Sequence, residues 1–172
     1  MKNVARIAFS VLLVAGVAAC AKKAVKPTVA PVDNSASSQP STSGMDNAGR
    51  YTRDSLDTDS CLRQRVVYFD LDKSEIKPEF QAQVACHAAY LKQFPQARVT
   101  LEGNTDERGS REYNLGLGER RGNAVQGAIS AAGASSSQLN VTSYGEERPV
   151  CRQHDESCWS KNRRVEIVYT AK

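Results

Sequence analysis

The stretch GNTDERGSREYNLGLGERR, residues 103–121, decides how this chain is organised. It begins as a polar loop and continues as a helix, because apolar or small residues then recur at helical spacing. These residues are Leu117, Ala124, Val125, Ala128, Ile129 and Ala132. Arg121 follows Leu117 by four positions and precedes Ala124 by three, so it projects from the same buried face. A cation therefore stands where a core residue is expected.

A buried cation is costly unless a nearby group compensates its charge. Asp106, in the loop ahead of the helix, is the nearest candidate partner for Arg121. Held side by side, the two could bind an amino-acid zwitterion, with the carboxylate taking the ammonium and the guanidinium taking the carboxylate. The alternative is an internal salt bridge that only fastens the loop to the helix.

The surrounding residues predict one domain, 60–172, of ordinary size and with a single core. Strands are expected at 65–69, 99–103, 139–143 and 163–169. Helices are expected from Pro78 to Pro95, from the loop at 104–109 to Gly133, and, as a short helix, within 146–162. The order β-α-β-α-β-(α)-β predicts an α/β fold, a two-layer sandwich with helical crossovers.

Residues 1–19 have the form of a signal peptide, in which two basic residues precede an apolar run that is short for a bilayer span. The run closes with Val17-Ala18-Ala19-Cys20, which resembles a bacterial lipobox. That resemblance implies cleavage before Cys20, lipidation of its sulfur and amino group, and anchoring by the acyl chains. Ala21, the next residue, implies sorting to the outer membrane. The alternative is an ordinary secretory signal that leaves Cys20 as a free thiol.

Residues 20–59 are expected to provide the lipid anchor and a flexible linker. Pro27, Pro31 and Pro40 interrupt this segment, and residues 35–43 are nearly all small or polar. With so little to bury, the segment is expected to stay disordered and to reach from a membrane surface to a structure nearby.

The charge balance argues against nucleic acid as a partner. The chain carries +4, and removal of Lys2 and Arg6 with the signal peptide reduces its 23 basic residues to 21, against 19 acidic ones. So small a surplus of basic residues, without interleaved basic and aromatic residues, does not indicate a basic surface that would bind a phosphate backbone.

Four cysteines remain after Cys20, and an even number in an exported chain suggests two disulfides. Cys151 and Cys158 bracket one loop and are expected to pair. Cys61 and Cys86 would then join the first strand to the first helix. Four cysteines permit three pairings, so the other connectivities stay open.

The sequence predicts neither a metal site nor catalysis. One candidate metal cluster is Cys151, His154, Asp155 and Cys158. Its spacing matches no standard zinc pattern, and no cofactor is expected. Cys86 and His87 are adjacent, but neighbours in a helix point about 100° apart and cannot form a nucleophile–base pair. Carboxylates near an arginine could act as acids or bases, but they fit a binding pocket equally well.

Four motifs identify the family. YFDLDKSEI at 68–76 resembles the opening strand of the OmpA-like peptidoglycan-binding domain, and residues 103–121 resemble its signature. SYGEERP at 143–149 and KNRRV at 161–165 complete the pattern, which covers nearly all of the expected domain. The resemblance implies an OmpA-like two-layer sandwich with a mixed four-stranded sheet. The cysteines of the late loop are not part of the family pattern.

In this family the ligand is the diaminopimelate side chain of the peptidoglycan stem peptide, whose free tip is a zwitterion. By position, the resemblance places the ammonium on Asp106 and the carboxylate on Arg121. The opposite wall and the helix side of the site are assigned to Asp70, Asp72, Asn114 and Leu117. Arg163 or Arg164 would brace the site.

Together with the lipobox, the resemblance implies an outer-membrane lipoprotein that faces the periplasm and ties the membrane to the cell wall without catalysis. Its expected partners are peptidoglycan, the membrane through its lipid, and TolB, a component of the Tol system that supports envelope integrity and cell division. Two alternatives stay open. One is an OmpA-like lipoprotein with the same binding outside the Tol system, and the other is a periplasmic cell-wall hydrolase.

Overall fold

The computed structural model describes residues 49–172. The expected signal peptide, the lipidation site Cys20 and the linker up to residue 48 lie outside the described residues. The elements, in chain order, are α1 (Ser55–Thr58), β1 (Val66–Tyr68), η1 (Pro78–Phe80), α2 (Gln81–Gln93), β2 (Arg98–Asn104), α3 (Arg111–Ala131), η2 (Ser136–Gln138), β3 (Leu139–Gly145), α4 (Glu156–Asn162) and β4 (Arg164–Ala171). Within residues 49–172, no helix combines the length and the apolar composition that a membrane crossing requires.

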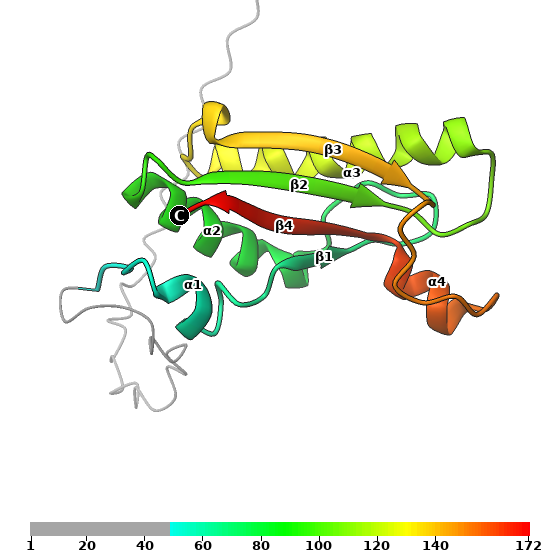
Figure 1. The fold of residues 1–172 in the computed structure, drawn as a ribbon, viewed down its shortest axis with the longest axis horizontal. Coiled ribbons are helices and arrows are strands. Elements are labelled where there is room, and N and C mark those ends of the chain that lie inside the picture. Colours follow the sequence, from blue (N-terminus) through cyan, green and yellow to red (C-terminus); the bar gives the residue numbers. More distant parts are fainter. Residues whose placement is uncertain (1–48) are drawn as a thin grey trace, which may run out of the picture. The chain divides into compact units, whose positions relative to one another are not determined.

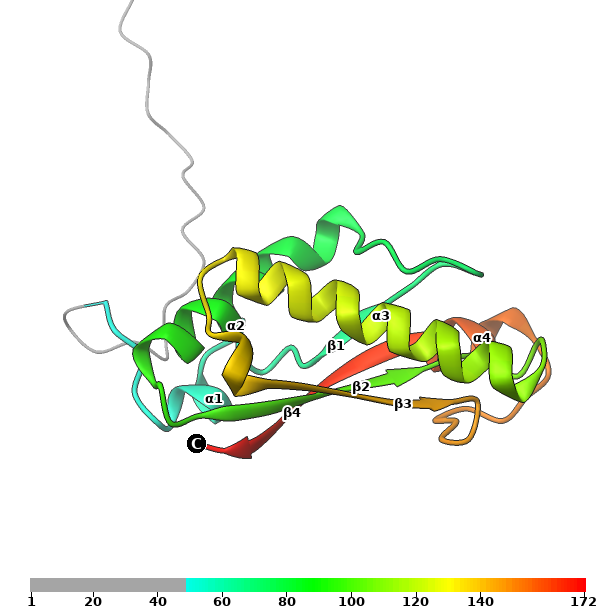
Figure 2. The same cartoon turned by 90° about the horizontal axis from the view of Figure 1, so that it is seen from above.

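The four strands form one mixed sheet in the order β1-β4-β2-β3. β2 and β3 run parallel and are joined through α3, whereas β4 is antiparallel to both β1 and β2. The helices α2 and α3 cover one face of this sheet (Figure 1, Figure 2). The predicted two-layer α/β sandwich with a mixed four-stranded sheet is therefore confirmed, including the short helix ahead of the last strand.

The core lies between the sheet and the two long helices. Alternate strand residues point into it because successive side chains of a strand face opposite sides. The buried set from the strands is Val67, Val99, Leu101, Val165 and Ile167. The helices contribute Val84, Ala88, Leu91, Val125 and Ile129, at the spacing of one helical face.

The described fold extends upstream of the expected boundary at residue 60. Tyr51 is 7% exposed and Leu56 is fully buried, and both belong to the core. The side chain of Gln93, at the end of α2, accepts a hydrogen bond from the Tyr51 N–H at 2.9 Å and donates one to the Tyr51 carbonyl. Two apolar residues in so polar a segment form no periodic pattern, so the sequence gives little sign of this packing. We call residues 49–65 the N-terminal arm.

Two disulfides are formed, and they match the expected pairing. Cys61 of the N-terminal arm is bonded to Cys86 of α2, with Cα atoms 6.3 Å apart. Cys151 is bonded to Cys158, with Cα atoms 4.9 Å apart. The first bridge fastens the arm to the helix layer, and the second closes the loop that leads into α4.

His87, beside Cys86, is fully buried and belongs to the core rather than to a catalytic pair. Its two ring nitrogens form hydrogen bonds of 2.9 Å with the Tyr169 hydroxyl and the Gln64 carbonyl. Burial lowers the pKa of His87 to about 4. The ring is therefore neutral at physiological pH, with both nitrogens satisfied.

Helix α3 approaches the sheet closely where two glycines meet. A Cβ on Gly103 would overlap the carbonyl of Gly118, and a Cβ on Gly118 would overlap the Ser143 hydroxyl. Neither position can carry a side chain unless the backbone moves. This contact brings the first turns of α3 against the ends of β2 and β3, so Arg121 lies beneath the surface.

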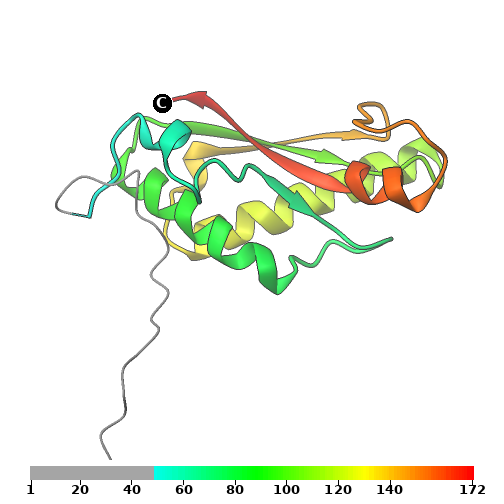
Figure 3. The same cartoon turned by 90° about the horizontal axis from the view of Figure 1, so that it is seen from below.

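The N-terminal arm and the loop after β2 lie at opposite ends of the domain (Figure 1, Figure 3). Tyr51 is bonded to Gln93, and β2 starts five residues later, at Arg98, and ends at Asn104. A strand of this length spans about 23 Å at 3.3 Å per residue. The other end contains the loop after β2 (105–110), the start of α3 and α4. We call it the cavity end.

Candidate functional site

A cavity of about 380 Å³ opens between the loop after β1, the loop after β2 and the first turns of α3. Its lining residues are Leu71, Asp72, Thr105, Asp106, Arg108, Gly109, Tyr113, Asn114, Leu117 and Arg121. Five of the six residues assigned to the site from the sequence are among them, and Asp70 is not. The volume lies in the range of small-molecule sites.

Arg121 is fully buried at the cavity. Its Nε donates to the Lys73 carbonyl at 2.9 Å, and its Nη1 and Nη2 donate to the carbonyls of Asn104 and Asp70 at 3.0 Å each. The guanidinium thus ties the loop after β1 to the end of β2. A guanidinium has five N–H donors, so these three bonds leave two N–H groups of Arg121.

The internal salt bridge between Arg121 and Asp106 is not formed, and that alternative is wrong. Within residues 49–172 no ion pair includes Arg121, because three of its N–H groups donate to backbone carbonyls and Asp106 pairs with other arginines. Burial, followed by the charge of Arg163, lowers the pKa of Arg121 to about 10, although Asp106 and Asp72 act in the opposite direction. The guanidinium also lies 5.2 Å from the centre of the Phe69 ring. Arg121 remains a cation at neutral pH, without a directly bonded carboxylate.

Asp106 is 4% exposed and is held by two other arginines. Arg108 donates to Oδ1 through Nε at 3.1 Å and to Oδ2 through Nη2 at 2.6 Å, and its backbone N–H donates to Oδ1 at 3.1 Å. Arg163 donates to Oδ2 through Nη1 at 3.1 Å. Burial opposes the ionisation of Asp106, but the bonds from Arg108 and Arg163 hold its pKa below the ordinary value. Asp106 is therefore an anion at neutral pH.

Of the two arginines proposed to brace the site, Arg163 occupies that position. Besides Asp106 it contacts Glu156, and its Nε donates to the Phe69 carbonyl at 3.0 Å. Arg164 instead pairs with Glu166, on the strand itself.

Asp70 and Asp72 have different roles. The Asp70 carboxylate faces Lys77, with Oδ1 3.7 Å from Nζ, and only its backbone carbonyl reaches the site. Asp72 accepts a hydrogen bond from the Tyr113 hydroxyl, and both residues line the cavity. The left-handed backbone of Asp72, with φ of 56°, turns the chain here. The wall expected from both aspartates is therefore formed by Asp72 and Leu71, without the Asp70 side chain.

The helix side of the cavity contains Asn114 and Leu117, which are 1% and 5% exposed. The Asn114 amide donates to the carboxylate of Glu146. Thr105 directly follows β2 and also lines the cavity. Its buried hydroxyl has no hydrogen-bond partner among the described residues. Buried polar atoms are almost always bonded, so this hydroxyl is available to a ligand.

A cluster next to Arg108 joins Trp159 of α4 to Glu107 and His154. The Trp159 indole N–H donates to Glu107 Oε1 at 2.9 Å, and His154 Nδ1 lies 2.6 Å from the same oxygen. The hydrogen bond to Glu107 raises the pKa of His154. Within residues 49–172 no three His, Cys, Asp or Glu side chains are grouped so that they could hold a metal ion.

Five lining residues were not anticipated: Leu71, Thr105, Arg108, Gly109 and Tyr113. For Arg108 the sequence indicated only the backbone contact, because an Asp side chain in a turn often accepts from the N–H two residues on. Tyr113 lies in the first turn of α3, toward the loop after β1, but no sequence spacing indicates its contact with Asp72, 41 residues away.

Comparisons with known proteins identify the family of this chain. Residues 68–163 match the OmpA family. The chain therefore belongs to the OmpA family.

Several similar proteins carry the name peptidoglycan-associated lipoprotein. The peptidoglycan-associated lipoprotein of Haemophilus influenzae is 48% identical over 107 residues, 62% of this chain and 70% of the relative. The one from Pseudomonas aeruginosa is 51% identical over 114 residues, 66% of this chain and 67% of the relative. The crystal structure of the peptidoglycan-associated lipoprotein from Burkholderia pseudomallei matches with a TM-score of 0.64 and 46% identity, over 64% of this chain and 94% of that one. The resemblance to the OmpA-like domain is confirmed, and so is the prediction that the chain is not an enzyme.

Proposed function

We propose that this chain is a cell-envelope lipoprotein that binds peptidoglycan non-covalently, through the zwitterionic tip of diaminopimelate. One observation carries the proposal. Arg121 is a fully buried cation at a cavity, and no carboxylate of the described residues neutralises it by direct contact. A ligand carboxylate would supply the missing negative charge. The name shared by the relatives supports peptidoglycan as the source of that ligand.

The polar atoms that line the cavity suit both ends of the zwitterion. The two free N–H groups of Arg121 can donate to a carboxylate, and such charge-assisted bonds are the strong ones. Asp106 is ionised, so its carboxylate has the charge that a ligand ammonium requires. The Thr105 hydroxyl adds a third polar contact from the same side.

The apolar lining suits the chain of methylene groups behind the zwitterion. Leu117 is buried on the helix side, whereas Leu71 and Tyr113 are 52% and 44% exposed. Exposed apolar side chains beside a polar cavity are a common feature of binding sites. The ligand would therefore bury its charged tip and lay its aliphatic part along these side chains.

The proposal extends to the cell. Lipidation of Cys20 would anchor the chain in the outer membrane, with the domain in the periplasm. The N-terminal arm lies at the end of the domain opposite the loop after β2 (Figure 1), and that loop lines the cavity. This arrangement suits a molecule held by a membrane on one side and the wall on the other. We place it in the Tol-Pal system, with TolB as a partner and a role in envelope integrity and cell division.

The proposal is tested with the full-length chain in detergent, by co-sedimentation with purified sacculi. Asp106→Asn keeps the shape of the side chain but removes its charge, and is expected to weaken binding about 30-fold or more. Asp57→Asn, at the exposed Asp57 of the arm, is the matched control and should bind normally. A muropeptide that carries free diaminopimelate should compete, and the same muropeptide with an amidated tip should not.

Retention of full binding by Asp106→Asn, or no effect of the free muropeptide, would exclude this site. Co-purification with TolB distinguishes a Tol-Pal role from the same binding outside that system. Variants of Arg121 would not separate binding from folding, because its three bonds to backbone carbonyls also support the structure.

A further inference from the structure

The Asp106 carboxylate has no acceptor position to spare. It accepts four hydrogen bonds, two from the Arg108 side chain, one from the Arg108 backbone N–H and one from Arg163, and an ionised carboxylate has about four such positions. An ammonium placed on the same carboxylate would become the third cation there. Like charges at such short range repel, so a ligand ammonium can bind well only if one guanidinium leaves.

Arg163 is not free to leave. Its side chain is 6% exposed, and it is bonded to the Phe69 carbonyl and to Glu156 as well as to Asp106. Removal of this side chain from Asp106 would break a buried network that connects β1, α4 and the loop after β2.

Arg108 is free to leave. Its side chain is 33% exposed, against 5% for the Asp106 carboxylate that it covers. Its backbone N–H donates separately to Asp106 Oδ1, so the loop keeps its turn when the guanidinium departs. Arg163 also keeps its bond to Asp106, which holds the carboxylate in position.

Two further partners already contact the Arg108 guanidinium in its position on Asp106. The Trp159 ring centre lies 4.2 Å from Arg108 Cζ, at the distance of a cation–π contact. Glu156 Oε2 lies 3.6 Å from Arg108 Nη2, and this carboxylate is on an exposed side chain. A small rotation would exchange Asp106 for these two partners and leave the guanidinium paired.

We propose that Arg108 is a resident competitor for Asp106. The ligand ammonium displaces the Arg108 guanidinium from Asp106, and the guanidinium then keeps Trp159 and Glu156 as its partners. This inference rests on the proposed function and adds a specificity device to it. A ligand with an ammonium alone must displace Arg108 without compensation. A ligand with both charges also gains the bonds to Arg121, so the site favours zwitterions over simple amines.

The test measures binding of a muropeptide tripeptide with free diaminopimelate to the full-length chain, by calorimetry. Arg108→Ala removes the competitor and is expected to tighten binding by about three- to tenfold. Arg108→Gln, which keeps the stem of the side chain, should tighten binding in the same direction. Arg111→Ala is the control, because it removes an equal charge from the same region, where Arg111 pairs with Glu147.

A spectroscopic measurement follows the movement itself. Trp159 is the single tryptophan of the chain, so its fluorescence reports on the position of Arg108. Ligand binding should change this emission in the wild-type chain and change it much less in Arg108→Ala.

The outcomes separate this inference from the proposed function. If the wild-type chain does not bind the tripeptide, the proposed function fails and the competition fails with it. If the wild-type chain binds but both Arg108 variants, with unchanged circular dichroism, bind equally or more weakly, only the competition is excluded. Tighter binding by both variants, with Arg111→Ala unchanged, would establish it.

Discussion

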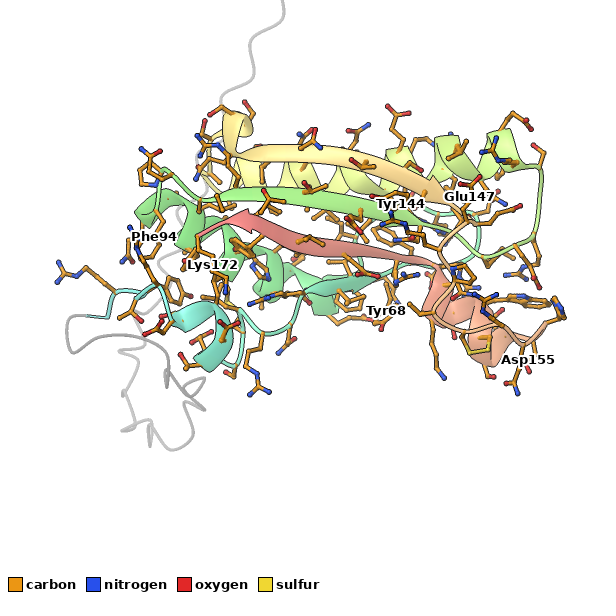
Figure 4. All side chains as sticks on the ribbon, in the orientation of Figure 1. Tyr68, Phe94, Tyr144, Glu147, Asp155 and Lys172 are labelled. Atoms are coloured by element: carbon orange, nitrogen blue, oxygen red, sulfur yellow. A yellow bond between two sulfur atoms is a disulfide. The ribbon has the colours of Figure 1, made fainter. Side chains whose placement is uncertain are left out.

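The two ends of the domain differ in the polar groups that they bury. At the end with the N-terminal arm, the fully buried His87 is neutral and bonded to Tyr169 and Gln64. The one charged side chain buried in the arm itself is Asp59, whose carboxylate accepts from the backbone N–H groups of Cys61 and Leu62. At the cavity end three charged side chains are buried together, since Arg121, Asp106 and Arg163 are all at most 5% exposed. Figure 4 marks the first end with Phe94 and Lys172 and the second with Glu147 and Asp155.

This difference separates stability from binding. Neutral groups that satisfy each other add to a core at little cost, whereas buried charges demand desolvation that packing must offset. A protein keeps such charges where a ligand can use them. We therefore expect the arm end to contribute stability through ordinary packing and the cavity end to depend on its arginine network.

The largest effect is expected at Arg121. Arg121→Met keeps most of the apolar stem but leaves three carbonyls without a donor, and should lower the free energy of unfolding by about 3–6 kcal/mol. Urea denaturation measures it. Arg120→Met, at the exposed neighbour, is the control and should change stability by less than about 0.5 kcal/mol. Equal effects for both would mean that the buried guanidinium does not hold the two loops together.

The two disulfides offer the next comparison. Cys61 and Cys86 are 25 residues apart and Cys151 and Cys158 are 7 apart, so the first bridge restricts the unfolded chain more. Replacement of both cysteines by serine should cost about 3.5 kcal/mol for the first bridge and about 2.5 kcal/mol for the second. Denaturation without reductant gives both values. A larger loss from the second pair would show that the bridge near α4 supports the native site directly.

The two histidines should respond to pH with opposite signs. His87 has a folded pKa of about 4, below its unfolded value of about 6.5, so the unfolded state binds more protons between these values. Stability should therefore fall by up to about 3 kcal/mol as pH drops from 6.5 to 4, and level off below. His154 has a raised pKa, so its smaller contribution is complete below pH 6.5 and is lost as pH rises through the folded pKa.

Unfolding in urea at several pH values, with NMR titration of both rings, tests this difference. The Glu107→Gln variant removes the partner of His154 and should return its pKa toward the ordinary value, with His87 unchanged. Titration of His87 near 6.5 in the folded chain would contradict its burial.

Most of the fold could be predicted from the sequence because its elements are long and periodic. The apolar face of α3 and the alternation in β2 place the layers without knowledge of any contact. The arm was missed because Tyr51 and Leu56 pack as isolated residues, held by Gln93 and by the Cys61–Cys86 bridge, and no local pattern encodes that.

The sequence could predict most of the residues assigned to the site, but not their hydrogen-bond partners. The position of Arg121 on an apolar helical face indicated a buried cation, and it is one. Its partners are backbone carbonyls, which carry no side-chain signal, so the direct pairing with Asp106 was wrong. The two arginines on Asp106 come from positions 2 and 57 residues away, and only the tertiary fold brings the second one there.

The placement of the arm opposite the cavity has a mechanical consequence. If the chain is held by a lipid at one end and by the wall at the other, tension enters at Tyr51 and leaves near residue 106, parallel to β2 and β4. Their ladder hydrogen bonds are perpendicular to the strands, so they resist that pull together, in shear, rather than one after another. Under such tension, only the part of the N-terminal arm before Cys61 can detach from the domain, because the disulfide to Cys86 holds the chain from that residue on.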